Sequence, residues 1–151
     1  MSNVEQKLQA MGLKLPACPA PVAAYLPVQT AGKLIYASGQ TAWVDGKLLY
    51  AGKVGGDVSV ADAYESAKLS AVNCLSAIAT VADLDQIRIV RVHGWVNGVP
   101  DFGDQPAVVN GASELLEALY GEHGRHARSA IGVGSLPTNA SVEIEIIAEK
   151  L

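Results

Sequence analysis

The chain has 151 residues, of which 11 are basic and 15 acidic, so its formal net charge is −4. This length predicts one domain over residues 1–151, with an N-terminal helix and an extended arm in residues 1–20. Nucleic-acid binding requires a dense basic surface, and the absence of any run of Lys or Arg argues against DNA or RNA as a partner. Without a signal peptide or an apolar stretch of about 18 residues, we expect a cytoplasmic protein with no membrane association.

Hydrophobic residues make up 50% of the chain and charged residues 17%, whereas the usual charged fraction is about 25%. A small domain with this balance is expected to bury part of its apolar surface in an oligomer. Its two cysteines, Cys18 and Cys74, are too few for a disulfide framework and lack the spacing of metal ligands. We therefore expect reduced, buried thiols and no metal.

The first half of the chain predicts two helices separated by short strands. A helix over residues 3–12 is followed by a proline-rich arm. Strands are predicted over residues 25–30, 34–38, 41–44 and 48–50. The dipeptide Asp45-Gly46 joins the last two as a hairpin. Ser59 followed by Asp62 is a capping-box pattern, and the apolar spacing of three and four after it predicts a helix of about 22 residues.

The second half predicts a helix over residues 105–120, with Asp104 suited to its N-cap and Gly121 to its C′ position. Strands are predicted over residues 87–97, 127–133 and 141–148. The predicted fold is α+β: a mixed sheet of about six strands with two long helices on one face.

Two long helices would leave the other face of this sheet uncovered. One side of the strand over residues 87–97 is predicted to carry Ile87, Ile89, Arg91, His93 and Trp95. The opposite side is predicted to carry Val90, Val92 and Val96. Because both sides are partly apolar, we expect other copies of the chain to cover the second face.

Arg128 and Glu143 are the candidate functional side chains. An arginine inside a predicted strand can hold a carboxylate through two parallel hydrogen bonds, and a buried glutamate with a raised pKa can act as a general acid or base. Alternatively, Arg128 forms an ion pair with Glu143 or Glu145 in a subunit interface. Whether Arg128 and Glu143 share a sheet face is expected to depend on the register of a hairpin across residues 134–140.

Other candidates are weaker. The histidines His93, His123 and His126 lack the spacing of metal ligands and are expected at the surface or in an interface. Ser38 precedes Gly39 but lacks the Gly-x-Ser-x-Gly pattern of a hydrolase nucleophile.

Two segments together resemble the Rid (reactive intermediate deaminase) family, also called the YjgF or endoribonuclease L-PSP-like family. Residues 34–40 have the sequence Leu-Ile-Tyr-Ala-Ser-Gly-Gln, which is similar to the family strand that ends in Ser-Gly-Gln. Residues 127–133, Ala-Arg-Ser-Ala-Ile-Gly-Val, and residues 142–148, Val-Glu-Ile-Glu-Ile-Ile-Ala, resemble the C-terminal family signature. The order of elements agrees along nearly the whole chain.

The resemblance implies a chorismate-mutase-like fold and a homotrimer with ligand clefts between subunits. It also implies hydrolysis of an enamine or imine such as 2-aminoacrylate to a 2-keto acid and ammonia, without a metal or organic cofactor. Arg128 matches the arginine that holds the substrate carboxylate, and Glu143 matches the glutamate that positions water. Ser38 and Gly39 match residues that line the cleft, and Asn110, a further candidate for substrate binding, resembles a polar residue found in the second helix region.

The sequence departs from the best-known deaminases at several positions. Ala130 stands where they have cysteine, and Tyr25 is displaced from the usual tyrosine position by the sequence Tyr-Leu-Pro-Val-Gln over residues 25–29. The N-terminal helix and the segment Pro-Asp-Phe-Gly-Asp-Gln-Pro over residues 100–106 indicate a distinct subgroup. Two hypotheses stay open: a deaminase, or a non-catalytic trimer that binds keto acids or other small carboxylates. The acidic composition argues against a third, a ribonuclease or translation inhibitor.

Overall fold

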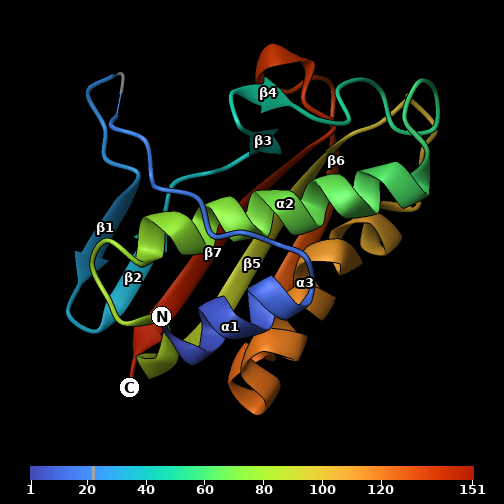
Figure 1. The fold of residues 1–151 in the computed structure, drawn as a ribbon. Helices are drawn as coiled ribbons and strands as arrows, with labels where there is room; N and C mark the ends of the chain where they lie inside the picture. Colours follow the sequence, from blue (N-terminus) through green and yellow to red (C-terminus); the bar gives the residue numbers. More distant parts are fainter. Residues whose placement is uncertain (22) are drawn as a thin grey trace.

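The computed structural model describes residues 1–21 and 23–151, and its centre is a five-stranded mixed sheet with the helices on one face (Figure 1). The sheet order is β1-β2-β7-β5-β6. These strands are β1 (Val28–Ala31), β2 (Leu34–Ala37), β5 (Ile87–Asn97), β6 (Ala127–Val133) and β7 (Val142–Lys150). The helices are α1 (Asn3–Ala10), α2 (Val60–Ile78) and α3 (Gln105–Tyr120), with 3-10 turns η1 (Leu84–Gln86), η2 (Gly121–Gly124) and η3 (Pro137–Asn139).

The long elements begin and end close to the predicted residues. The bounds of α3, β5 and β6 are those predicted, whereas α2 has 19 residues and ends earlier than expected. The Ser59 side chain caps α2 by accepting a hydrogen bond of 3.1 Å from the backbone N–H of Asp62. Asp104 occupies the N-cap position of α3, but its side chain makes no capping hydrogen bond.

A separate two-stranded ribbon lies outside the main sheet. It consists of β3 (Trp43–Val44) and β4 (Lys47–Leu48), which pair only with each other. The turn residues Asp45 and Gly46 both have positive φ angles, 49° and 78°, as a tight two-residue hairpin requires. The main sheet consequently has five strands rather than about six.

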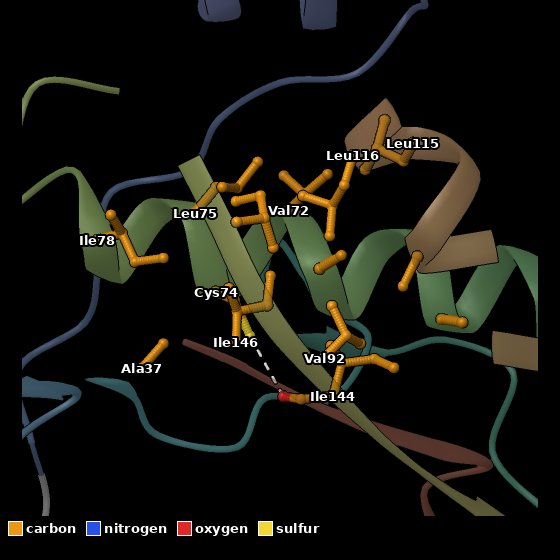
Figure 2. Packing of buried hydrophobic residues seen from close by; sticks show 14 of the residues in the cluster. Ala37, Val72, Cys74, Leu75, Ile78, Val92, Leu115, Leu116, Ile144 and Ile146 are labelled. Atoms are coloured by element: carbon orange, nitrogen blue, oxygen red, sulfur yellow. Dashed lines mark hydrogen bonds between the residues drawn. The ribbon is translucent and has the colours of Figure 1, made fainter. Parts of the chain in front are cut away.

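The hydrophobic core lies between the helices and the sheet (Figure 2). Leu75 and Ile78 of α2 are fully buried, as are Ile144 and Ile146 of β7. Cys74 belongs to the same cluster, and its Sγ donates a hydrogen bond of 3.2 Å to the carbonyl oxygen of Ile144. Burial raises the pKa of this thiol, so Cys74 is buried as predicted, whereas Cys18 is only half-buried.

A close approach of backbones joins α2 to α3. A Cβ atom added to Gly111 would lie 2.0 Å from the carbonyl oxygen of Tyr64, a separation that no side chain tolerates. Glycine at this position of α3 therefore lets the two helices pack side by side over the sheet.

The predicted side-chain alternation along β5 is wrong in its first half. A register shift between Ile89 and Arg91 inserts Val90 as an extra residue. Ile87 and Ile89 are consequently in the core, at 1% and 3% exposure, instead of sharing the open face with Arg91. The bulge therefore places Ile87 and Ile89 in the core and leaves a more polar row of side chains on the open face.

The expected hairpin between β6 and β7 is also absent, because β5 lies between them. β5 pairs in parallel with β6 and antiparallel with β7. The segment from Gly134 to Ser141, which contains η3, therefore crosses over a strand instead of forming a hairpin turn. In the described part of the chain, no helix is long and apolar enough to cross a membrane.

Candidate functional site

Arg128 lies on the helix-covered side of the sheet, against α3. Arg128 belongs to the edge strand β6, where it pairs in register with the buried Val92 of β5. Its side chain extends to α3. Its Nη1 atom donates hydrogen bonds of 2.9 Å to Oδ1 of Asn110 and 3.1 Å to Oγ of Ser113. Its Nη2 atom donates a longer bond of 3.4 Å to the carbonyl oxygen of Pro106.

One edge of this guanidinium is available to a ligand. Both Nη1 hydrogens are used, and Nη2 uses one of its two. Within residues 1–21 and 23–151, Nε of Arg128 has no hydrogen-bond partner. Nε and Nη2 lie along one edge of a guanidinium, and such an edge can bind a carboxylate through two parallel bonds.

The acceptors on α3 form one stripe along the helix. Pro106, Asn110 and Ser113 are separated by four and three residues, so they lie on one face of α3. Asn110 was predicted as a site residue, and Ser113 was missed. The spacing of three residues between Asn110 and Ser113, which places both on one face of the predicted helix, is the signal that would have identified Ser113.

Ser113 in turn contacts His126, which precedes β6. The distance between Oγ of Ser113 and Nε2 of His126 is 2.9 Å, and Nδ1 of His126 lies 2.6 Å from the carbonyl oxygen of Gly124. Burial lowers the pKa of His126, and the nearby Arg128 charge lowers it further. His126 had been expected only as a surface or interface side chain.

Glu143 lies on the open face, on the other side of the sheet. It is opposite Trp95 on the neighbouring strand, whereas its chain neighbours Val142 and Ile144 point into the core. Burial raises the pKa of the half-buried Glu143 carboxyl, and the nearby Glu145 charge raises it further. This carboxyl has no hydrogen-bond partner among the residues that the structure describes.

Gly39 lies directly beneath the Glu143 carboxyl. A Cβ atom added to Gly39 would lie 2.7 Å from Oε2 of Glu143, so only glycine leaves the carboxyl in this place. Gln40 holds the segment beside β7 through backbone hydrogen bonds of 2.8 and 2.9 Å with Ile144. Ser38 precedes Gly39, and its hydroxyl donates a hydrogen bond of 2.7 Å to the carbonyl oxygen of Leu26.

The side chains of Tyr25 and Ala130 form no hydrogen bond with Arg128 or Glu143 in the described residues. Tyr25 is 56% exposed and precedes β1, which begins at Val28 instead of at Tyr25 as predicted. Ala130 lies on the same side of β6 as Arg128 and packs against the core.

The open face also carries a row of side chains from β5. Nε of Arg91 donates a hydrogen bond of 2.8 Å to Nε2 of His93, and Nη2 of Arg91 donates one of 2.8 Å to Oγ of Ser129. The ring of His93 stacks on Trp95, with centroids 5.6 Å apart. Across from this row, Glu145 lies opposite His93.

The structure thus divides the predicted site into two half-sites. The arginine half-site contains Arg128, Asn110 and Ser113 and lies between α3 and β6. The glutamate half-site contains Glu143, Gly39 and Ser38 and lies at β7 on the open face. Adjacent strands are about 4.8 Å apart, so β6 and β7 are separated by about 10 Å across β5, and the half-sites face opposite ways.

Neither half-site has the donor set of a metal centre. In the chain apart from residue 22, no three His, Cys, Asp or Glu side chains gather to form one. Arg128 and Asn110 are suited to an organic anion, and Glu143 to proton transfer or to holding water.

Comparison with known proteins identifies the class of this α+β chain. The family model described as "YjgF/chorismate mutase-like, putative endoribonuclease" matches residues 5–150. The chain therefore belongs to the YjgF family, which is endoribonuclease L-PSP-like and has a chorismate-mutase-like fold, as the sequence motifs indicated.

Individual relatives agree with this assignment. Protein TCP17 of Trypanosoma cruzi is 37% identical over 150 residues, covering 97% of this chain and 94% of the relative. The crystal structure of Atu1372 from Agrobacterium tumefaciens, a protein described as of unknown function, has 44% identity and a TM-score of 0.91, covering 99% of this chain and 93% of that one. The YjgF gene product of E. coli has 26% identity and a TM-score of 0.64, covering 89% and 94%.

Proposed function

We propose that this protein is a cytoplasmic deaminase of the Rid type, which hydrolyses an enamine or imine that carries a carboxylate. With 2-aminoacrylate, tautomerisation gives 2-iminopropanoate. Water then adds to the imine carbon, the carbon–nitrogen bond breaks, and the products are pyruvate and ammonia. The observation that carries the proposal is the Arg128 guanidinium, which is held by α3 with one edge left for a carboxylate.

Arg128 would anchor the carboxylate of the substrate. Three acceptors on α3 restrict the guanidinium, so little side-chain freedom is left to lose when a ligand binds. A guanidinium edge recognises a planar carboxylate in one orientation, which would fix the position of the adjacent imine carbon.

Glu143 would supply the proton chemistry. A carboxyl with a raised pKa can hold and deliver a proton closer to neutral pH than an ordinary glutamate can. As a carboxylate it would orient the attacking water and accept its proton. As a carboxylic acid it would donate a proton to the departing nitrogen, so that ammonia leaves.

The two half-sites would meet between copies of the chain. Within one chain they face opposite sides of the sheet, so one substrate cannot contact both. A second copy that places its β6 edge strand beside the open face of the first would bring its Arg128 toward the Glu143 of the first. We propose a homotrimer, in which three such contacts close a ring and the open faces are buried together.

A second candidate function is supported by Ala130. The best-known deaminases have cysteine at this position, and here the side chain is a methyl group packed against the core. If that cysteine is needed for turnover, this protein would bind keto acids or other small carboxylates without converting them.

One assay separates the two functions. A dehydratase would generate 2-aminoacrylate, and the decay of the imine would be followed with and without the protein. Accelerated decay is expected, and light scattering at micromolar concentration is expected to give three times the mass of one chain. Calorimetry with pyruvate that detects binding, together with no accelerated decay, would favour the binding function. A monomer would refute the shared site.

Ribonuclease activity is not proposed, although the name of the family mentions it. The chain has four more acidic than basic residues and no basic run. Highly purified protein is expected to leave single-stranded RNA intact, and cleavage that copurifies with the protein would contradict this expectation.

A further inference from the structure

A relay of hydrogen bonds connects the backbone of η2 to Arg128. It runs from the carbonyl oxygen of Gly124 to Nδ1 of His126, at 2.6 Å, and from Nε2 of His126 to Oγ of Ser113, at 2.9 Å. The last step joins Oγ of Ser113 to Nη1 of Arg128, at 3.1 Å. Only the Gly124 end is backbone, so two side chains transmit its position to the guanidinium.

The chemistry of the partners sets the direction of each bond. A carbonyl oxygen can only accept, so Nδ1 of His126 carries the proton and Nε2 of the neutral ring carries a lone pair. Ser113 therefore donates its hydroxyl proton to Nε2. Its oxygen then presents its lone pairs to Arg128, which can only donate.

The surroundings keep His126 neutral. The ring is half-buried, and burial lowers its pKa. Among the charged groups that face the ring, Arg128 also lowers the pKa, and Glu117 on α3 raises it. The neutral form is the one in which Nε2 accepts from Ser113, so the relay is in place at neutral pH.

We propose that His126 and Ser113 are positioning residues, which fix the Nη1 side of Arg128 so that its opposite edge is presented to the substrate carboxylate. This inference rests on the proposed function, because it assumes that Arg128 is the carboxylate anchor. Ser113 and His126 are spaced like a nucleophile and its base, but the Ser113 oxygen already accepts from Arg128. The geometry therefore assigns them to the arginine.

Substitutions that remove the relay should weaken carboxylate binding. Ser113→Ala and His126→Phe each remove a link, and each is expected to weaken pyruvate binding about two- to tenfold, the value of one net hydrogen bond. In the imine assay KM should rise by the same factor with kcat unchanged, because the carboxylate contact is present in both ground and transition states. Ser113→Thr keeps the hydroxyl, and His126→Gln keeps a donor for the Gly124 carbonyl and an acceptor for Ser113, so both variants should bind pyruvate as the wild type does.

A double variant tests whether the two residues act as one unit. Ser113→Ala combined with His126→Phe should lose no more affinity than either single change, since one missing link already breaks the relay. Losses that multiply, or a fall in kcat with KM unchanged, would overturn the proposal. His123→Gln alters an exposed histidine nearby and should leave pyruvate affinity and KM at the wild-type values.

Nuclear magnetic resonance of the histidine side chains tests the relay without any substrate. The His126 ring should carry its proton on Nδ1, and Arg128→Ala should raise the pKa of His126 because a nearby positive charge is removed. A proton on Nε2 would overturn the relay alone. A wild-type protein that neither binds pyruvate nor accelerates imine decay would instead overturn the proposed function.

Discussion

The two half-sites hold their charged groups in opposite ways. Arg128 lies against α3 with three hydrogen-bond acceptors, one of which is tied to His126. The carboxyl of Glu143 lies over Gly39 with no hydrogen-bond partner in the described residues, and burial raises its pKa. The arginine half-site thus fixes the orientation of its charged group. The glutamate half-site leaves its carboxyl free to gain and lose a proton.

This difference corresponds to two tasks that a hydrolase separates. A binding contact gains from a side chain whose orientation is settled before the ligand arrives. A general acid or base gains from a pKa close to the working pH, and hydrogen bonds to a carboxylate would lower that pKa. Changes to the arginine half-site should therefore affect affinity, and changes to the glutamate half-site should affect turnover.

The largest effect is expected from mixing two impaired variants. Arg128→Ala and Glu143→Gln should each have strongly reduced activity as homogeneous assemblies, whereas coexpressed chains should recover part of the wild-type activity. In a ring whose sites take one half from each of two copies, about a quarter of the sites would be intact. Deaminase activity of the purified mixture is the measurement. A mixture no more active than its parents would show that the half-sites do not meet between copies.

Removing the arginine should greatly weaken substrate binding. Arg128→Ala loses charge-assisted hydrogen bonds of about 1.5–3 kcal/mol, which corresponds to about tenfold to a few hundredfold in kcat/KM. Calorimetry with pyruvate and the imine decay assay both measure this loss. Arg125→Ala is the matched control, because this exposed arginine forms its ion pairs with Glu117 and Glu122 and none with the proposed site, among the residues that the structure describes. Equal losses in both variants would contradict a specific role for Arg128.

Moving the Glu143 carboxyl by a substitution at Gly39 should reduce turnover and leave pyruvate affinity unchanged. The Cβ of Gly39→Ala would lie 2.7 Å from Oε2 of Glu143, and the flexible carboxyl should move aside. We expect kcat to fall about tenfold to a hundredfold, part of the contribution of general acid–base catalysis, with pyruvate affinity unchanged. Gly134→Ala, where no heavy atom lies within 4 Å, should have wild-type kcat. A weaker affinity for pyruvate in Gly39→Ala would contradict the assignment of binding to the arginine half-site and of turnover to the glutamate half-site.

The smallest effect concerns stability and pH. Burial raises the pKa of Glu143 in the folded state, so ionising this carboxyl at a pH above that raised pKa destabilises the fold. Below the ordinary glutamate pKa of 4.5, the carboxyl is protonated in both the folded and the unfolded state and does not change the free energy of unfolding. Glu143→Gln should therefore raise the free energy of unfolding at pH 7 and leave it unchanged near pH 4. Denaturant unfolding at equal protein concentration measures this, with the exposed Glu122→Gln as control. Greater stabilisation at pH 4 than at pH 7 would contradict the raised pKa.

Much of the fold was predictable because its signals are local. The bounds of α3 follow from apolar spacing that ends at Gly121, and the separate hairpin follows from Asp45 and Gly46. The candidate residues Arg128 and Glu143 were also identifiable, since each is a charged side chain within an apolar strand pattern. Periodicity and turn chemistry depend on residues only a few positions apart, so a sequence displays them directly.

The spatial relation between the candidate residues depended on contacts far apart in the chain. β5 lies between β6 and β7, and the registers place Arg128 opposite the buried Val92 but Glu143 opposite Trp95 on the open face. The two residues therefore belong to different half-sites, and no local pattern indicates which strand lies between two others. The bulge at Val90 reversed the faces predicted for Ile87 and Ile89, because one extra residue shifts a period of two by half. Local periodicity indicates which side chains share a face of a regular strand. Bulges and strand order, which depend on tertiary contacts, determine which faces those side chains occupy and which strands lie side by side.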